Sequence, residues 1–106
     1  MSETDIISRL EAVIASRRSG DPQASYVAKL EAAGAGKIAQ KLGEEATETV
    51  IAALTQDRDA LVGEAADLVF HLLVLLGHKD IAWSDVLAEL DRREGVSGIT
   101  EKASRK

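Results

Sequence analysis

The sequence predicts an all-α fold, a small bundle of about five helices whose core is completed by association with further copies of the chain. Residues that favour helices (Ala, Leu, Glu and Lys) are abundant, whereas only one Pro and 3% aromatic residues occur. Apolar residues recur at helical spacing in several segments. A chain of 106 residues suits one domain, 1–106, which buries only a modest share of its surface by itself.

The first half of the chain contains three predicted helices. The first covers 4–18, ends at the Gly-Asp-Pro sequence of 20–22, and has an apolar stripe formed by Ile6, Leu10, Val13 and Ile14. The second covers 25–33 and stops at Gly34. The third covers 37–55, and its expected core residues are Ile38, Leu42, Val50, Ala53 and Leu54.

Two more helices are predicted in the second half. The fourth covers 60–76, and Asp57 or Asp59 in the preceding turn can cap it. The fifth starts after Trp83, with Ser84 as the expected N-cap, and reaches about residue 94. The remaining residues form a polar tail that is basic at its end.

The fourth helix predicts the oligomer. Residues 68–76 leave it almost no polar face, and a soluble helix that is apolar all round is buried all round. A chain this small has little material to cover such a helix, so we expect a homo-oligomer, with a dimer as the expected form. The alternative is that the other helices wrap the fourth helix within one chain.

Composition excludes several classes of function. A net charge of −5 argues against a general nucleic-acid binder, and the absence of Cys with only two His argues against a structural zinc site. The most apolar stretch, 68–76, is too short for a membrane span, which needs about 20 residues. The acidic N-terminus does not match a signal peptide. We therefore expect a cytoplasmic protein that binds neither membrane nor nucleic acid.

Two pairs of carboxylates carry the predicted chemistry. Glu45 and Glu48 lie on the third helix, and Glu64 and Asp67 on the fourth. Three residues of helix separate the members of each pair by about 60°, so each pair lies on one face. The short turn between the two helices favours antiparallel packing. If both acidic faces point into the same groove, four carboxylates converge.

Converging carboxylates favour a divalent cation. Their mutual repulsion raises their pKa values or destabilises the bundle, and a magnesium ion, which prefers oxygen ligands and phosphates, removes the repulsion. Asp67 is the most informative residue, because it lies inside an apolar segment near positions expected to be buried. The alternative is that these carboxylates form an ordinary solvated face.

Three further side chains are candidates for phosphate contacts. His71 shares a helix face with Asp67 and Glu64, and it is equally consistent with a core histidine bonded to the backbone. Lys41 and Lys37 precede the Glu45–Glu48 pair by one and two turns, although Lys41 can equally support Glu45 as an ordinary ion pair.

The two acidic motifs, E-x-x-E at 45–48 and E-x-x-D at 64–67, resemble those of the all-helical MazG-type nucleoside triphosphate pyrophosphohydrolases. Segments along nearly the whole chain are similar to one branch of that superfamily, the phosphoribosyl-ATP pyrophosphatases. These segments are 25–30, 37–46, 66–71, 92–95, 97–99 and 101–105.

The resemblance implies the second step of histidine biosynthesis, in which phosphoribosyl-ATP and water give phosphoribosyl-AMP and pyrophosphate. It implies magnesium bound by Glu45, Glu48, Glu64 and Asp67, and magnesium-assisted water attack at the α-phosphorus. The expected catalytic residues are Glu44, Glu45 and Glu48, with Glu44 as an outer ligand or base. The expected substrate-binding residues are Lys37, Lys41 and His71.

Two rival functions stay open from the sequence. A pyrophosphatase of the same fold that acts on other nucleotides has the same carboxylate motif. A non-catalytic helical oligomerisation module has surface carboxylates and binds no magnesium.

Overall fold

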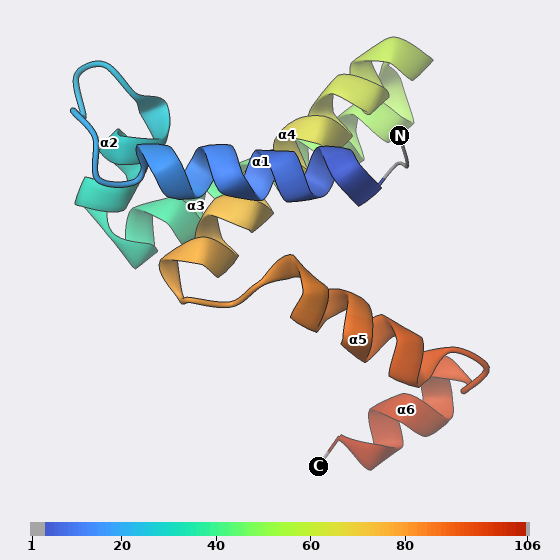
Figure 1. Cartoon of the computed structure of the whole chain (residues 1–106). Coiled ribbons are helices and arrows are strands. Elements are labelled where there is room, and N and C mark those ends of the chain that lie inside the picture. The colour runs from blue at the N-terminus through green and yellow to red at the C-terminus, as the bar shows by residue number, and fades with distance from the viewer. Residues whose placement is uncertain (1–3, 106) are drawn as a thin grey trace.

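The computed structural model of the chain describes residues 4–105 and contains six α-helices and no strand within that range (Figure 1). This confirms the predicted all-α bundle. The helices are α1 (Thr4–Arg17), α2 (Tyr26–Ala33), α3 (Ala35–Thr55), α4 (Arg58–His78), α5 (Trp83–Arg93) and α6 (Gly98–Ser104).

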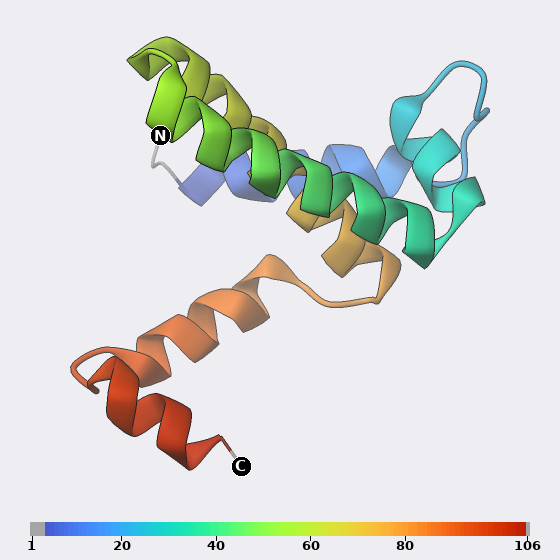
Figure 2. The same cartoon turned by 180° about the vertical axis from the view of Figure 1, so that it is seen from behind.

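The first four helices form the body of the molecule. The long helices α3 and α4 lie side by side and antiparallel, α1 crosses α4, and α2 packs at the beginning of α3 (Figures 1 and 2). Their buried side chains form one core, which consists of Ile14, Val27, Leu30, Ile38, Leu73 and Val74. Gly34, whose φ of 95° favours glycine, makes the sharp connection between α2 and α3.

Helices α5 and α6 extend away from this body as an arm (Figures 1 and 2). The radius of gyration is 15.7 Å, whereas a compact chain of this length has about 13 Å. The arm is attached at its base, where the backbone N–H of Trp83 donates to Oε2 of Glu11 at 2.8 Å and the indole packs on the core. Farther out, Leu90 and Ile99 are exposed.

Several predicted helix ends are confirmed and others are wrong. Asp57 caps α4 as predicted, since its carboxylate accepts from the N–H of Ala60 at 2.9 Å. The N-cap of α5 is Ala82 rather than Ser84, because the carboxylate of Asp85 accepts from the backbone of Ala82. The tail contains a further helix, α6, which Ser97 caps.

The alternative that the other helices wrap α4 within one chain is wrong. Only His71, Leu73 and Val74 are buried on this helix, and the rest of its apolar side chains are partly covered or exposed. On α3, Val50 and Leu54 were expected in the core but are 57% and 79% exposed.

Helix α1 differs from the prediction in the same way. Its stripe includes Ile7 rather than Ile6, and Val13 is exposed. The common reason is that the core uses Ile38 near the start of α3 and the 69–75 stretch of α4, so within residues 4–105 no member of this core lies at the end where α3 turns into α4.

Candidate active site on helices α3 and α4

The site is built by the antiparallel packing of α3 and α4. The two helices are joined by Gln56 and Asp57, and the Asp57 cap fixes where α4 begins. This arrangement places the middle of α3 against the first half of α4 (Figure 2). The acidic motifs of the two helices therefore face each other across the pair.

Three of the predicted metal ligands come together. Glu45, Glu48 and Glu64 each offer a carboxylate oxygen, and these oxygens all lie within 4.8 Å of one another. Glu45 and Glu64 are half-buried, and Glu48 is exposed. Oxygen atoms at this separation can share one or more hard cations. We refer to these three residues as the carboxylate cluster.

Asp67 lies beside the carboxylate cluster but is not part of the close group. Its charge acts on Glu45. Asp67 itself is exposed, although it lies near positions that were expected to be buried. On the helix face that Asp67 shares with His71 and Val74, burial begins only at His71.

Glu45 has the most unusual surroundings of the cluster. Its Oε2 is fully buried, and no hydrogen-bond partner reaches this atom within the part of the chain that the structure describes. Its pKa rises from 4.5 to about 7, first because burial disfavours the charged form, then because of a hydrogen bond and charge from Glu48. The charges of Asp67 and Glu64 raise the pKa as well. A buried oxygen without a donor in a crowd of carboxylates fits a cation ligand.

Glu44, the neighbouring acid, has the opposite surroundings. Its carboxylate accepts hydrogen bonds from Gln40 at 2.9 Å and from Lys41 at 3.1 Å. These bonds, with the nearby charges of Lys41 and Lys37, lower the pKa of Glu44. A carboxylate held this firmly in its charged form is a weak proton acceptor, which favours an outer supporting position over the role of base.

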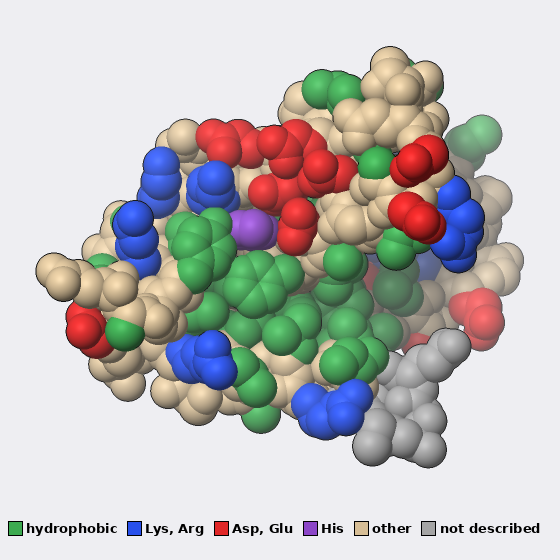
Figure 3. Space-filling view, turned by 90° about the horizontal axis from the view of Figure 1, so that it is seen from above, with side chains coloured by type: hydrophobic (Ala, Val, Ile, Leu, Met, Phe, Trp, Pro, Cys, Tyr) green, Lys and Arg blue, Asp and Glu red, His purple; other side chains and the backbone are tan. Residues whose placement is uncertain are grey.

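The two predicted phosphate-binding lysines lie on the same side of α3. Lys41 pairs with Glu44 rather than with Glu45, and this pairing raises the pKa of the lysine. Lys37 is exposed one turn earlier. Figure 3 shows a face on which acidic side chains gather beside a histidine, with basic side chains and a broad hydrophobic area next to them. Positive and negative groups therefore adjoin, as a metal–phosphate ligand requires.

His71 is buried, and both of its ring nitrogens have partners. Nδ1 lies 2.8 Å from the backbone carbonyl of Asp67, and Nε2 lies 2.7 Å from the hydroxyl of Tyr26. The carbonyl can only accept, so in the neutral imidazole Nδ1–H donates to it and Nε2 accepts from the tyrosine. This is the arrangement of a core histidine bonded to the backbone, and it leaves no ring nitrogen free for a phosphate.

Tyr26 was assigned no role from the sequence. Its ring contacts His71 edge-on and stacks on Phe70, with ring centres 6.2 Å apart. Burial raises the pKa of the Tyr26 hydroxyl, and the charges of Lys41, Glu45, Glu44 and Asp67 also act on this pKa. Tyr26 therefore lies at the rim of the carboxylate cluster. No spacing rule links two residues 45 positions apart, and only the fold brings Tyr26 to His71.

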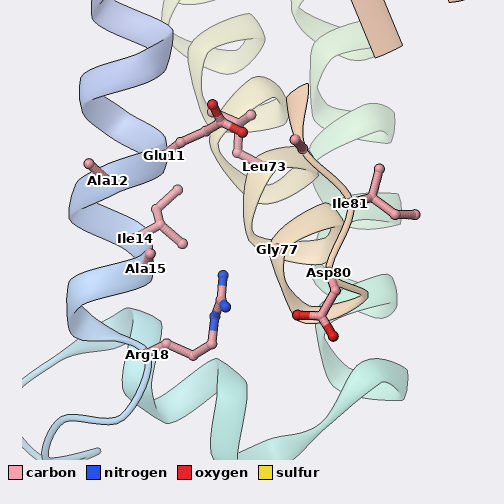
Figure 4. A pocket seen from close by; sticks show the side chains of 10 residues that line it. Glu11, Ala12, Ile14, Ala15, Arg18, Leu73, Gly77, Asp80 and Ile81 are labelled. Carbon is pink, nitrogen blue, oxygen red and sulfur yellow. The ribbon is translucent and has the colours of Figure 1, made fainter. Parts of the chain in front are cut away.

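A hollow between α1 and the end of α4 is separate from the carboxylate cluster. It measures about 390 Å³ and is lined by Glu11, Arg18, Gly77 and Asp80 among others (Figure 4). Gly77 follows Glu64 by 13 residues along α4, which corresponds to about 20 Å. This hollow therefore belongs to the other end of the helix pair.

Comparison with known proteins identifies the family. The profile of the phosphoribosyl-ATP pyrophosphohydrolase family matches residues 7–94. A protein named phosphoribosyl-ATP pyrophosphatase from Novosphingobium aromaticivorans is 70% identical to this chain, over 99% of the chain and 98% of the relative. Proteins of the same name from Erythrobacter litoralis and Rhizorhabdus wittichii are 64% and 62% identical, over 93% and 96% of this chain and 95% and 96% of the relatives. Together with the all-helical fold, these matches place the chain in the phosphoribosyl-ATP pyrophosphohydrolase family.

Proposed function

We propose that the chain hydrolyses phosphoribosyl-ATP to phosphoribosyl-AMP and pyrophosphate at the carboxylate cluster with the help of magnesium. As a member of its family, the chain is a hydrolase of histidine biosynthesis. The observation that carries the proposed site is the meeting of Glu45, Glu48 and Glu64, whose carboxylate oxygens lie within 4.8 Å of one another.

The donor set fits magnesium. Glu45, Glu48, Glu64 and Asp67 would hold the ion, and the buried Oε2 of Glu45, which has no donor within residues 4–105, is the strongest support. Bound magnesium neutralises the carboxylates and the phosphates and polarises the phosphoryl group. An all-carboxylate site with no neutralising ion leaves Glu45 partly protonated near neutral pH, because its pKa is about 7.

The protein side of the reaction is positioning, proton transfer and charge balance. A water oxygen bonds to the α-phosphorus, the bond between that phosphorus and the oxygen bridging to the β-phosphate breaks, and pyrophosphate leaves. Glu45 or Glu48 accepts the proton of the water, while Glu44 keeps Lys41 in place. Lys41 and Lys37 bind phosphate oxygens on the same side of α3. His71 supports the site from within the core rather than by contact with phosphate.

A pyrophosphatase for other nucleotides is the nearest rival. The carboxylate cluster cannot distinguish substrates, because it interacts with phosphates and metal. Phosphoribosyl-ATP is favoured by the shared name of relatives that cover almost the whole chain.

We further propose that residues 1–106 act as one domain within a homodimer in the cytoplasm. The dimer is supported by exposed apolar side chains where α3 turns into α4, namely Val50, Ile51, Leu54 and Val62. Helix α4 is long and apolar enough to cross a membrane, and 17% of that stretch is buried in one chain. Glu64 and Asp67 within it make a second protein chain a better cover than lipid.

The test is pyrophosphate release from phosphoribosyl-ATP, ATP and the common deoxynucleoside triphosphates, each with magnesium and with chelator. We expect magnesium-dependent release from phosphoribosyl-ATP alone. Release mainly from another nucleotide would move the function to the rival pyrophosphatase. No release from any nucleotide would favour a non-catalytic module.

A further inference from the structure

Tyr26 is held rigidly between two helices. Its hydroxyl donates to Nε2 of His71, which is itself fixed by the carbonyl of Asp67. Its ring lies against Phe70 of α4. Even so, 45% of the residue is exposed. An aromatic ring that is fixed on one side and open on the other presents a flat apolar surface to a ligand at little cost in conformational entropy.

Tyr26 also belongs to a hollow beside the carboxylate cluster. This hollow measures about 590 Å³ and is lined by Pro22, Gln23, Ala24, Ser25, Tyr26 and Lys29. The volume is within the range of small-molecule sites. The hydroxyl of Tyr26 lies 2.7 Å from His71, whose other ring nitrogen contacts the carbonyl of Asp67, so Tyr26 connects the hollow to the helix segment that carries the acidic motif.

The hollow offers a particular set of groups. Lys29 is its cation, it is exposed, and no ion pair occupies it among the residues that the structure describes. The hydroxyl of Ser25 accepts from the N–H of Ala28 at 3.2 Å and keeps its own O–H to donate. The hollow therefore offers one positive charge next to one aromatic face.

Phosphoribosyl-ATP differs from ATP by a second ribose phosphate attached to its base. This extra group is dianionic near neutral pH and lies on the far side of the base from the triphosphate. A site that recognises it needs a cation beside a surface for the base, and Lys29 lines the same hollow as Tyr26. We propose that the hollow between Pro22 and Lys29 binds this second ribose phosphate, with Tyr26 against the base and Lys29 on the phosphate.

This inference rests on the proposed substrate, and it assigns the selection of that substrate to the α1–α2 connection rather than to the metal ligands. Lys37 and Lys41 would then serve the triphosphate, and Lys29 the group that ATP lacks. The hydroxyl of Tyr26 donates its hydrogen bond to His71, so toward the ligand it accepts hydrogen bonds. It therefore suits a ribose hydroxyl better than a phosphate oxygen.

The test compares binding of phosphoribosyl-AMP and AMP by titration calorimetry in magnesium, for the wild type, Lys29→Met and Tyr26→Leu. Wild type should prefer phosphoribosyl-AMP. Lys29→Met should weaken phosphoribosyl-AMP about tenfold and leave AMP unchanged. Tyr26→Leu should weaken both about tenfold, because both ligands carry the base. Lys79→Met, which changes an exposed lysine at the far end of α4, is the matched control and should bind like wild type.

The outcomes separate this inference from the proposed function. If the wild type binds the two nucleotides with equal affinity, the hollow is not a ribose phosphate site. The same conclusion follows if Lys29→Met weakens the binding of both nucleotides by the same factor. Pyrophosphate release from phosphoribosyl-ATP is measured on the same samples. Intact release by Lys29→Met with an unchanged KM would overturn the hollow and leave the proposed function standing. If the wild type prefers phosphoribosyl-AMP to AMP but releases no pyrophosphate from phosphoribosyl-ATP, the proposed function alone is overturned.

Discussion

Replacing Glu45 by Gln should stabilise the metal-free protein above neutral pH. The pKa of Glu45 is raised from 4.5 to about 7, so between these values the folded chain binds more protons than the unfolded chain. The stability that the protonated Glu45 contributes is complete below about pH 4.5 and is lost as the pH rises through about 7. Glutamine has nearly the same shape as the protonated acid and cannot ionise, so it avoids this loss.

The magnitude follows from the size of the pKa change. A rise from 4.5 to about 7 corresponds to roughly 3 kcal/mol at about 1.4 kcal/mol per pH unit. Because Glu45 is only half-buried, water screens part of the repulsion, and we expect about 2 kcal/mol at pH 8. In magnesium the wild type should be the more stable protein, because the ion stabilises the wild type and binds more weakly to the variant, which lacks one of its ligands.

The assay is urea unfolding followed by circular dichroism, at pH 5 and pH 8, with chelator and with magnesium, at one fixed protein concentration. Glu44→Gln is the matched control. Hydrogen bonds from Gln40 and Lys41 lower the pKa of Glu44 in the wild type, so the Glu44→Gln variant should lose stability above about pH 4.5 rather than gain it. Identical pH dependence of wild type and Glu45→Gln in chelator would refute the reasoning.

Three further predictions follow from the site and the surface. Glu48→Gln should lower kcat/KM for phosphoribosyl-ATP about 100-fold or more with an unchanged circular dichroism spectrum, and full activity would remove Glu48 from the ligand set. His71→Leu should lower the free energy of unfolding by about 1–3 kcal/mol in urea titrations, because it leaves the Tyr26 hydroxyl and the Asp67 carbonyl without their partner, and an unchanged unfolding midpoint would show that these bonds contribute nothing. Leu54→Glu, at a position that is 79% exposed, should convert a dimer to monomers in light scattering, and an unchanged mass would place the subunit contact elsewhere.

Local features of the site could be predicted from the sequence. The spacing of Glu45 and Glu48 puts them on one helix face wherever the helix packs. The acid at Asp57 marks the start of α4 by a hydrogen bond three residues away, which local rules describe well. The short connection between α3 and α4 then leaves antiparallel packing as the simple solution, and the cluster with Glu64 follows.

Other features depend on contacts that local rules do not describe. Asp67 lies near positions that were expected to be buried because its neighbours are apolar, but on the helix face that it shares with His71 and Val74 burial begins only at His71. The contact of Tyr26 with His71 joins α2 to α4 and has no signature in spacing. The exposure of Val50 and Leu54 shows that apolar periodicity identifies a face to be covered without saying which chain covers it.

The most direct test of the carboxylate cluster is the magnesium dependence of pyrophosphate release from phosphoribosyl-ATP by wild type and Glu64→Gln. If Glu45, Glu48 and Glu64 hold the ion, the wild type should be inactive in chelator, and the variant should need at least about tenfold more magnesium for half-maximal rate at an unchanged fold. The same magnesium dependence in both proteins, or full activity of the wild type in chelator, would contradict the account.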